Sequence, residues 1–146
     1  MATKIKGLFE RVDPGKFTEK VGIPLGWMVI SHHHIPDKQE RRKVHGRWYR
    51  VTSQGISVFR VLRFAPNLHF DWDGTSDLVI DWVGWLDLHG RASDVDGPLE
   101  LEIEQVSPLL LPMMIVMHPD PTSRLAGWIA LVSLALGVLS ILLVFK

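Results

Sequence analysis

The chain has 146 residues, with 16 basic and 16 acidic side chains and no cysteine. The absence of cysteine excludes disulfides, thiolate metal sites, iron–sulfur clusters and thioether-linked haem. Beside the apolar C-terminal segment, the length leaves room for one domain with a modest core and not for two.

The two signs of charge are separated along the sequence. Residues 1–50 contain 11 Lys/Arg and 5 Asp/Glu, whereas residues 51–100 contain 3 and 8. A basic N-terminal half suits an anionic cytoplasmic leaflet or an acidic protein surface. The N-terminus also lacks the apolar run of a signal peptide. We therefore expect the domain on the cytoplasmic side of a bacterial inner membrane or an equivalent membrane.

Residues 1–25 are predicted to form a basic arm that contains a short amphipathic helix. Its apolar residues follow the i, i+3, i+4, i+7 spacing of one helix face, at Ile5, Leu8, Phe9 and Val12. An Asp-Pro-Gly sequence then ends the pattern. Such a helix can pack on its own domain, lie on a membrane or dock on a partner. Ile5, Leu8 and Phe9 are therefore candidate partner-interface residues.

Three adjacent histidines, His32, His33 and His34, follow a predicted strand at residues 26–30. In an extended segment, successive side chains point to opposite faces, so at most two of the three could share a metal ion. We interpret them as a polar surface loop and keep them as weak metal candidates. The charged residues 37–43 are predicted to be a linker. They lack interleaved aromatic residues, which argues against nucleic-acid binding.

Residues 26–118 are predicted to form an antiparallel β domain. Residues 47–52 and 56–64 are rich in β-branched and aromatic residues, and alternation with one apolar face is found at residues 68–72, 78–88 and 99–104. A three-residue loop at 53–55 joins the first two of these segments. The pattern predicts a mainly β fold, a small meander that forms a sandwich or an open barrel.

Two apolar features interrupt this pattern. Trp85 lies on the polar face of the predicted strand 78–88, where it either contacts a partner or belongs to a second core layer. Residues 107–117 are apolar, contain two prolines and are too short to span a membrane. We predict a last core strand there that ends near the membrane interface, with an interfacial segment as the alternative.

Residues 121–145 are predicted to form a C-terminal transmembrane helix. Residues 125–145 contain no charged residue, and a helix of 21 residues spans about 30 Å, the thickness of the hydrocarbon core. Asp120 and Pro121 suit the start of this helix. Candidate membrane-interface residues flank it, at Arg124, Trp128 and Lys146. Small residues lie on one helix face, at Ala130, Ser133, Gly137 and Ser140, and predict packing against another membrane helix.

Motifs for catalysis or cofactor binding are not recognisable in the sequence, so we predict a protein that is not an enzyme and holds no cofactor. Asp71, Asp73 and Asp77 resemble part of a calcium loop, but the distal bidentate Glu of the helix–loop–helix motif is missing. The same residues fit an ordinary hairpin turn.

These features favour a non-catalytic, tail-anchored accessory, scaffold or assembly subunit of a larger membrane complex, as in respiration or photosynthesis. Its expected partners are the lipid bilayer and other integral membrane subunits, and not nucleic acid. One alternative is a stand-alone membrane-anchored β domain that binds a lipid or small ligand, with a pocket lined by Trp72, Trp82 or Trp85. Another alternative is a His-dependent metal or haem protein.

Overall fold

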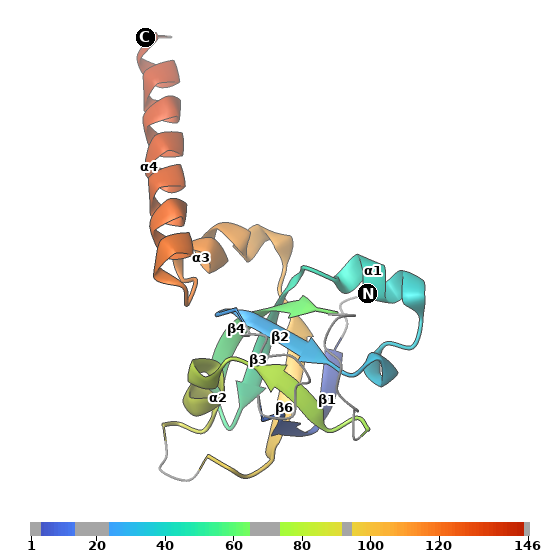
Figure 1. Ribbon diagram of the computed structural model, residues 1–146. Coiled ribbons are helices and arrows are strands. Elements are labelled where there is room, and N and C mark those ends of the chain that lie inside the picture. Colours follow the sequence, from blue (N-terminus) through green and yellow to red (C-terminus); the bar gives the residue numbers. More distant parts are fainter. Residues whose placement is uncertain (1–3, 14–23, 65–73, 92–94, 145–146) are drawn as a thin grey trace. The chain divides into compact units, whose positions relative to one another are not determined.

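The computed structural model describes residues 4–13, 24–64, 74–91 and 95–144. The chain divides into two compact units, Met1–Val106 and Ser107–Lys146. The first unit is a β-barrel with two short α-helices, and the second is helical (Figure 1). The mainly β fold with one long apolar helix near the C-terminus is therefore confirmed.

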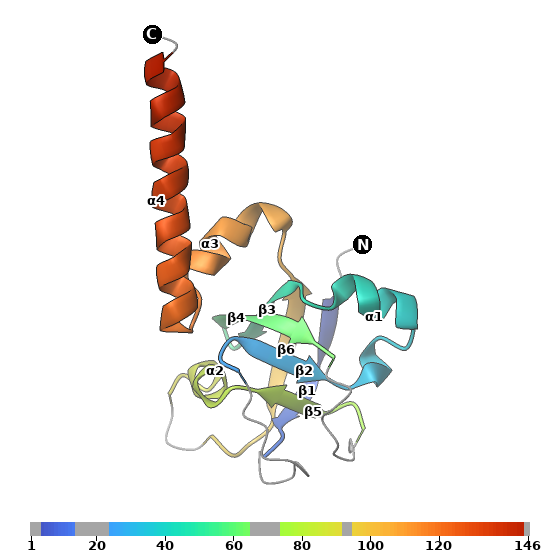
Figure 2. The same ribbon diagram turned by 45° about the horizontal axis from the view of Figure 1, so that its top comes forward.

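Six strands form the closed barrel of the first unit, in the order β1-β5-β2-β4-β3-β6 (Figures 1 and 2). Their bounds are β1 Lys4–Arg11, β2 Trp27–Ile30, β3 Trp48–Ser53, β4 Ile56–Arg63, β5 Asp77–Ile80 and β6 Leu99–Gln105. The pairs β1–β5 and β2–β4 are parallel, and the others are antiparallel. The sheet is therefore mixed and closed, unlike the predicted antiparallel meander, because β2 and β5 lie beside strands that are distant in sequence.

The predicted N-terminal helix is wrong, because residues 4–11 form strand β1. Ile5 and Phe9 point into the barrel, while Lys4, Lys6 and Leu8 point outward. Ile5 and Phe9 follow the alternation of the strand, whereas Leu8, which the helical spacing also included, lies on the outer face. Pairing decides between the two readings, because β1 forms an antiparallel ladder with β6 from Lys4↔Glu104 to Phe9↔Leu99. Without β1, the edge of β6 would be left unpaired.

The β3–β4 hairpin is confirmed, although its loop has two residues rather than three. Ser53 pairs with Ile56, and Gln54 and Gly55 have φ angles of 46° and 85°. Two consecutive positive φ angles are typical of a type I′ turn, whose twist matches that of the flanking strands. Glycine adopts this conformation at little cost.

The predicted strand 78–88 is wrong after Ile80, because Trp82–Leu88 forms helix α2. The carboxylate of Asp81 caps this helix by accepting a hydrogen bond from Gly84 N at 2.9 Å. The buried residues of α2 follow helical spacing, at Gly84, Trp85 and Leu88. The sequence signal for this helix is an N-cap aspartate directly before an apolar run. The apparent alternation of apolar and polar residues favoured a strand instead.

Residues 38–44 are also helical, so the predicted charged linker is wrong. Helix α1 spans Lys38–Val44, and Gln39 N donates to Asp37 Oδ1 at 3.0 Å. Asp37 and Glu40 have the spacing of a capping box, which the charge run concealed. The short 3₁₀ helix η2, His32–His34, precedes α1. In both views α1 and α2 lie on opposite sides of the barrel (Figures 1 and 2).

The second unit contains η3 Pro108–Leu110, α3 Leu111–Val116 and α4 Pro121–Val144. The predicted core strand at 107–117 is wrong, and this segment lies outside the barrel unit. Proline lacks the N–H that a strand ladder requires but suits the first turn of a helix, which is where Pro112 lies. A Cβ at Gly127 of α4 would lie 2.6 Å from Ile115 Cγ2 of α3, so glycine allows the two helices to pack closely.

The predicted start of the long helix is confirmed. Asp120 Oδ2 accepts hydrogen bonds from Ser123 N at 2.8 Å and Ser123 Oγ at 2.7 Å, and α4 begins at Pro121. These hydrogen bonds lower the pKa of the Asp120 carboxyl group.

Packed side chains fill the barrel interior. The largest fully buried residues of this unit come from every strand and from α2: Phe9, Met28, Ile30, Tyr49, Leu62, Leu78, Ile80, Trp85, Leu88, Leu101 and Ile103. On β6 the outward residues Glu100, Glu102 and Glu104 alternate with the buried ones, as predicted. The interior is therefore a hydrophobic core and not a ligand chamber.

One ion pair is buried beside this core. The side chains of Arg60 and Asp81 are 5% and 3% exposed, and Nε–Oδ2 and Nη2–Oδ1 distances of 2.5 and 3.1 Å join them. Arg60 Nη1 also donates to Phe59 O at 2.7 Å. The pair fixes α2 to β4, and a Cβ at Gly84 would clash with the guanidinium group.

We expect Asp81→Ala to lower the free energy of unfolding by about 3–5 kcal/mol, because it leaves the Arg60 charge buried without its partner. The matched control is Asp87→Ala, which removes the more exposed Asp87–Arg91 pair and should cost at most about 1 kcal/mol. Urea unfolding of the full chain in detergent, followed by tryptophan fluorescence, measures both. Equal losses would contradict a special role for the buried pair.

Ion pairs on the outer wall join β1, β6 and β3. Glu102 contacts Lys4 and Lys6, and Arg50 Nη2 lies 2.6 Å from Glu104 Oε2. Hydrogen bonds from the two lysines lower the pKa of Glu102 from 4.5 to about 2, and donation to the Glu102 carboxylate raises the pKa of Lys4. Lys4, Lys6 and Arg50 are therefore neutralised locally.

The lowered pKa of Glu102 predicts an acid-dependent contribution to stability. The stabilisation is present above pH 4.5 and disappears as the pH falls toward about 2, because the folded state must then accept the proton that the unfolded state accepts earlier. The thermal unfolding temperatures of the wild type and Glu102→Gln should differ at neutral pH and converge as the pH approaches about 2. Glu100→Gln, on the same strand, is the control. A difference between wild type and Glu102→Gln that does not change with pH would contradict this account.

Candidate functional site

Among the residues that the structure describes, α4 is the one helix that is long enough and apolar enough to cross a membrane. Its 24 residues correspond to about 36 Å, slightly more than a hydrocarbon core of about 30 Å. Apolar side chains are exposed around its circumference, including Ile129, Leu134, Val138 and Leu139, which point in different directions at about 100° per residue. A helix in water would bury one such face, so this surface matches a lipid environment.

The four small residues predicted to pack against another helix all lie exposed on α4: Ala130, Ser133, Gly137 and Ser140. A Cβ at Gly137 would meet nothing within 4 Å, and Ser140 Oγ donates to Leu136 O at 2.9 Å. The hydroxyl group of Ser140 is therefore satisfied within the helix, and the small face remains open to a neighbour. Helix packing by this face stays a prediction.

The predicted membrane-interface residues Arg124 and Trp128 lie in the first turns of α4, and both are exposed. An indole and a guanidinium group at a helix end suit the headgroup region. Lys146 lies outside the described residues.

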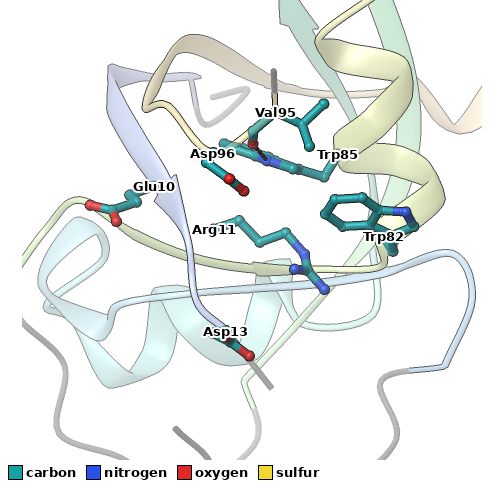
Figure 3. A pocket seen from close by; sticks show the side chains of 7 residues that line it. All are labelled: Glu10, Arg11, Asp13, Trp82, Trp85, Val95 and Asp96. Carbon is teal, nitrogen blue, oxygen red and sulfur yellow. Dashed lines mark hydrogen bonds between the residues drawn. The ribbon is translucent and has the colours of Figure 1, made fainter. Parts of the chain in front are cut away.

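A hollow of about 290 Å³ opens on the first unit, between the end of β1, helix α2 and the segment before β6. Seven residues line it: Glu10, Arg11, Asp13, Trp82, Trp85, Val95 and Asp96. Figure 3 shows Arg11 reaching from β1 toward Trp82, with Asp96 on the side of Trp85. Glu10 points away from the two indoles (Figure 3). Sequence reasoning proposed the tryptophans as pocket residues but missed Arg11, because the parallel β1–β5 pairing that brings it to α2 leaves no local signal.

Arg11 is held in place by two contacts. Its guanidinium carbon lies 5.0 Å from the centroid of the Trp82 ring, and its Nε donates to Ile80 O at 3.3 Å. Partial burial lowers the pKa of Arg11, and nearby Asp13 and Asp81 oppose this effect. The cation–π contact thus uses one side of Trp82, whose side chain remains half exposed.

Trp85 forms the inner wall of the hollow. Its Nε1 donates to Val95 O at 2.9 Å, and its ring meets the His89 ring edge-on with centroids 4.8 Å apart. At 2% exposed, Trp85 belongs to the core. The second of the two alternatives, a core layer, is therefore correct for Trp85, and the partner-interface prediction is wrong because α2 turns this residue inward.

The same correction applies to two other predicted interface residues. Ile5 and Phe9 are 8% and 0% exposed and fill the barrel. Leu8 is 59% exposed on the outer wall and remains available to a partner.

The three histidines of η2 make separate local contacts. The His32 and His33 rings stack with centroids 4.4 Å apart, and His33 Nδ1 lies 2.8 Å from Ser31 Oγ. His34 Nε2 lies 2.6 Å from Thr75 O, and its ring is 5.3 Å from that of Phe9. Within the described part of the chain, no three His, Cys, Asp or Glu residues are grouped so that they could hold a metal ion.

The predicted calcium-like turn is only partly described. Asp71, Trp72 and Asp73, together with the predicted strand 68–72, lie outside the described residues. Asp77 begins β5 and is 8% exposed.

Comparison of the chain with protein-family models, with curated proteins and with solved structures finds no match.

Proposed function

We propose that this protein is a membrane-anchored, non-catalytic module that contributes to a larger membrane protein assembly. In this proposal α4 is the anchor and the barrel is the domain presented to partners beside the membrane. The observation that carries the proposal is the exposed apolar surface around the whole circumference of α4. Burial of such a surface in lipid removes it from water, which is strongly favourable.

The construction of the barrel supports a binding role over a catalytic one. Its interior is filled by apolar side chains, and its buried polar pair, Arg60–Asp81, is fully engaged in holding α2. Among the residues that the structure describes, the groups that usually perform acid–base or nucleophilic chemistry are thus not gathered at an open cavity in the core.

The small-residue face of α4 supports a helical partner in the membrane. Membrane helices associate through van der Waals contact rather than through hydrophobic exclusion, so small side chains that admit a second backbone are favourable. The basic character of residues 1–50 supports a cytoplasmic orientation of the barrel.

We expect Ser133→Leu combined with Gly137→Leu to dissociate the protein from its assembly, because two large side chains would separate the packed helices. The matched control is Ala135→Leu with Val138→Leu, which enlarges side chains on the opposite helix face at about 100° per residue. The readout is a native gel of membranes extracted in mild detergent, with mass spectrometry of the band that contains this chain.

In this experiment both variants should stay in the membrane pellet after an alkaline wash, since the apolar surface is retained. Only the Ser133/Gly137 variant should lose its high-mass band. The co-purifying chains then identify the process. Wild-type protein that is released by the alkaline wash would contradict the anchor, and wild-type protein that runs alone would contradict the assembly.

A second candidate function is the binding of a small cationic ligand in the hollow beside α2. The observation that favours it is the combination of two indoles with the carboxylates of Asp13 and Asp96, against the single guanidinium group of Arg11. Aromatic faces and nearby carboxylates together attract cations.

Titration of the full chain with choline or spermidine should then change the tryptophan fluorescence of the wild type, because Trp82 is half exposed at the hollow. Trp82→Ala should abolish the change. Trp128→Ala, which removes an exposed tryptophan from α4, should preserve it. An unchanged wild-type spectrum would exclude this candidate for these probes.

A further inference from the structure

We infer that the barrel docks on anionic lipid headgroups through one particular end, and this inference rests on the proposed membrane anchoring. We call this surface the basic end and define it by its exposed basic residues, Lys38, Arg42, Lys43 and Arg47. The proposal adds a second, electrostatic membrane contact to the hydrophobic one made by α4.

Helix α1 presents the basic end as a rigid surface. Asp37 caps its first turn, and Arg41 Nη1 donates to the carbonyl oxygens of Ile35 and Pro36 at 2.8 and 2.7 Å. Val44 anchors the helix in the core. Arg41 thus serves to hold the helix, while the side chains of the basic end extend into solvent.

The charges of the basic end are not neutralised by the protein. Among the residues that the structure describes, Lys38, Arg42, Lys43 and Arg47 form no ion pair with a carboxylate, whereas wall residues such as Lys4 and Arg50 are paired with glutamates of β6. The side chain of Arg47 donates to Lys43 O at 3.4 Å and so lies at the C-terminus of α1. Lys38, Arg42 and Lys43 lie on α1 and Arg47 lies just after it, so together they outnumber Glu40, the exposed carboxylate of this helix, and form a compact positive surface.

The chain leaves the barrel at this same end. The last barrel residue, Val106, donates its N–H to Trp48 O at 2.9 Å, and Trp48 directly follows Arg47. In the barrel, the start of β3 and the end of β6 lie side by side, with Gln105 paired to Tyr49. The covalent connection toward α4 therefore begins beside the basic end, which keeps this end within reach of the membrane surface.

The connection itself has a composition that suits lipid. Within the second unit, η3 and α3 expose large apolar side chains at Leu109, Leu110, Met113, Ile115 and Met117, with Leu109 being 89% exposed. An apolar segment that packs on the first turns of a membrane helix fits the headgroup–acyl boundary. A bilayer satisfies both this segment and the positive charges of the basic end, whereas an acidic protein surface would satisfy only the charges. We therefore favour lipid as the occupant.

The test uses the full chain, which contains no cysteine, so that one introduced cysteine gives a unique label. Gln39→Cys places a fluorophore on exposed α1, and Gly97→Cys places it before β6, at the opposite end of the barrel, where a Cβ meets nothing within 4 Å. Each protein is reconstituted into phosphatidylcholine vesicles with or without phosphatidylglycerol, and quenching by a headgroup-attached quencher is measured. We expect stronger quenching at position 39 in the anionic vesicles and no dependence on lipid at position 97.

Charge variants in the Gln39→Cys background separate electrostatics from helix structure. The combined changes Lys38→Gln, Arg42→Gln and Lys43→Gln should weaken docking, by about fivefold for each charge removed. The matched control exchanges the same residues as Lys38→Arg, Arg42→Lys and Lys43→Arg, and should dock as the wild type does. Salt at about 1 M, where the Debye length is about 3 Å, should abolish the lipid dependence.

Equal quenching at position 39 in both vesicle types would overturn the proposal, and so would full docking by the glutamine variant or loss of docking by the charge-conserving control. A basic end that binds an acidic protein instead would give the first of these results. Co-flotation of each protein with its vesicles is recorded in parallel. Failure of anchoring therefore appears as a protein that does not float, and failure of docking appears as a floating protein without lipid-dependent quenching.

Discussion

The packing of helix α2 against the barrel depends on the buried ion pair between Arg60 and Asp81. Asp81 stands at the junction of β5 and α2, and its carboxylate both caps the helix and binds the guanidinium group from β4. Two unpaired charges at this depth would be too costly to bury, so the turn into α2 is fixed once the strands have paired. Trp85 then seals the core, and Trp82 is placed at the edge of the hollow.

Local sequence patterns predicted correctly those elements whose pattern fits only one type of secondary structure. Strand β6 alternates Leu99, Leu101 and Ile103 with glutamates, and α4 is too apolar and too long for a small soluble domain, so both were predicted correctly. Strand β1 and helix α2 were not, because the local spacing of their apolar residues favoured the wrong period. Only pairing with β6, in one case, and the capping carboxylate of Asp81, in the other, decide between the periods.

The candidate sites were less predictable than the fold, because they arise from contacts that are distant in sequence. Arg11 and Trp82 are 71 positions apart, yet they form one cation–π contact at the hollow. Similarly, the sequence separates basic from acidic halves, but the barrel places β6 between β1 and β3 and so cancels much of this separation on its wall. The basic residues of α1 can be identified as lacking a carboxylate partner only after these strand pairings are known.

Closure of the barrel by β1 and β6 has a consequence for how the chain acquires its structure. These strands are the first and last of the unit, and Ile5 pairs with Ile103, so the final seam joins residues nearly one hundred positions apart. Such non-local pairing slows folding, because the entropy of a long loop is lost before the contact is gained. During synthesis, β1 and β3 therefore keep open edges until β6 emerges from the ribosome. A nascent chain that stalls before this point exposes two unpaired strands and is prone to aggregation.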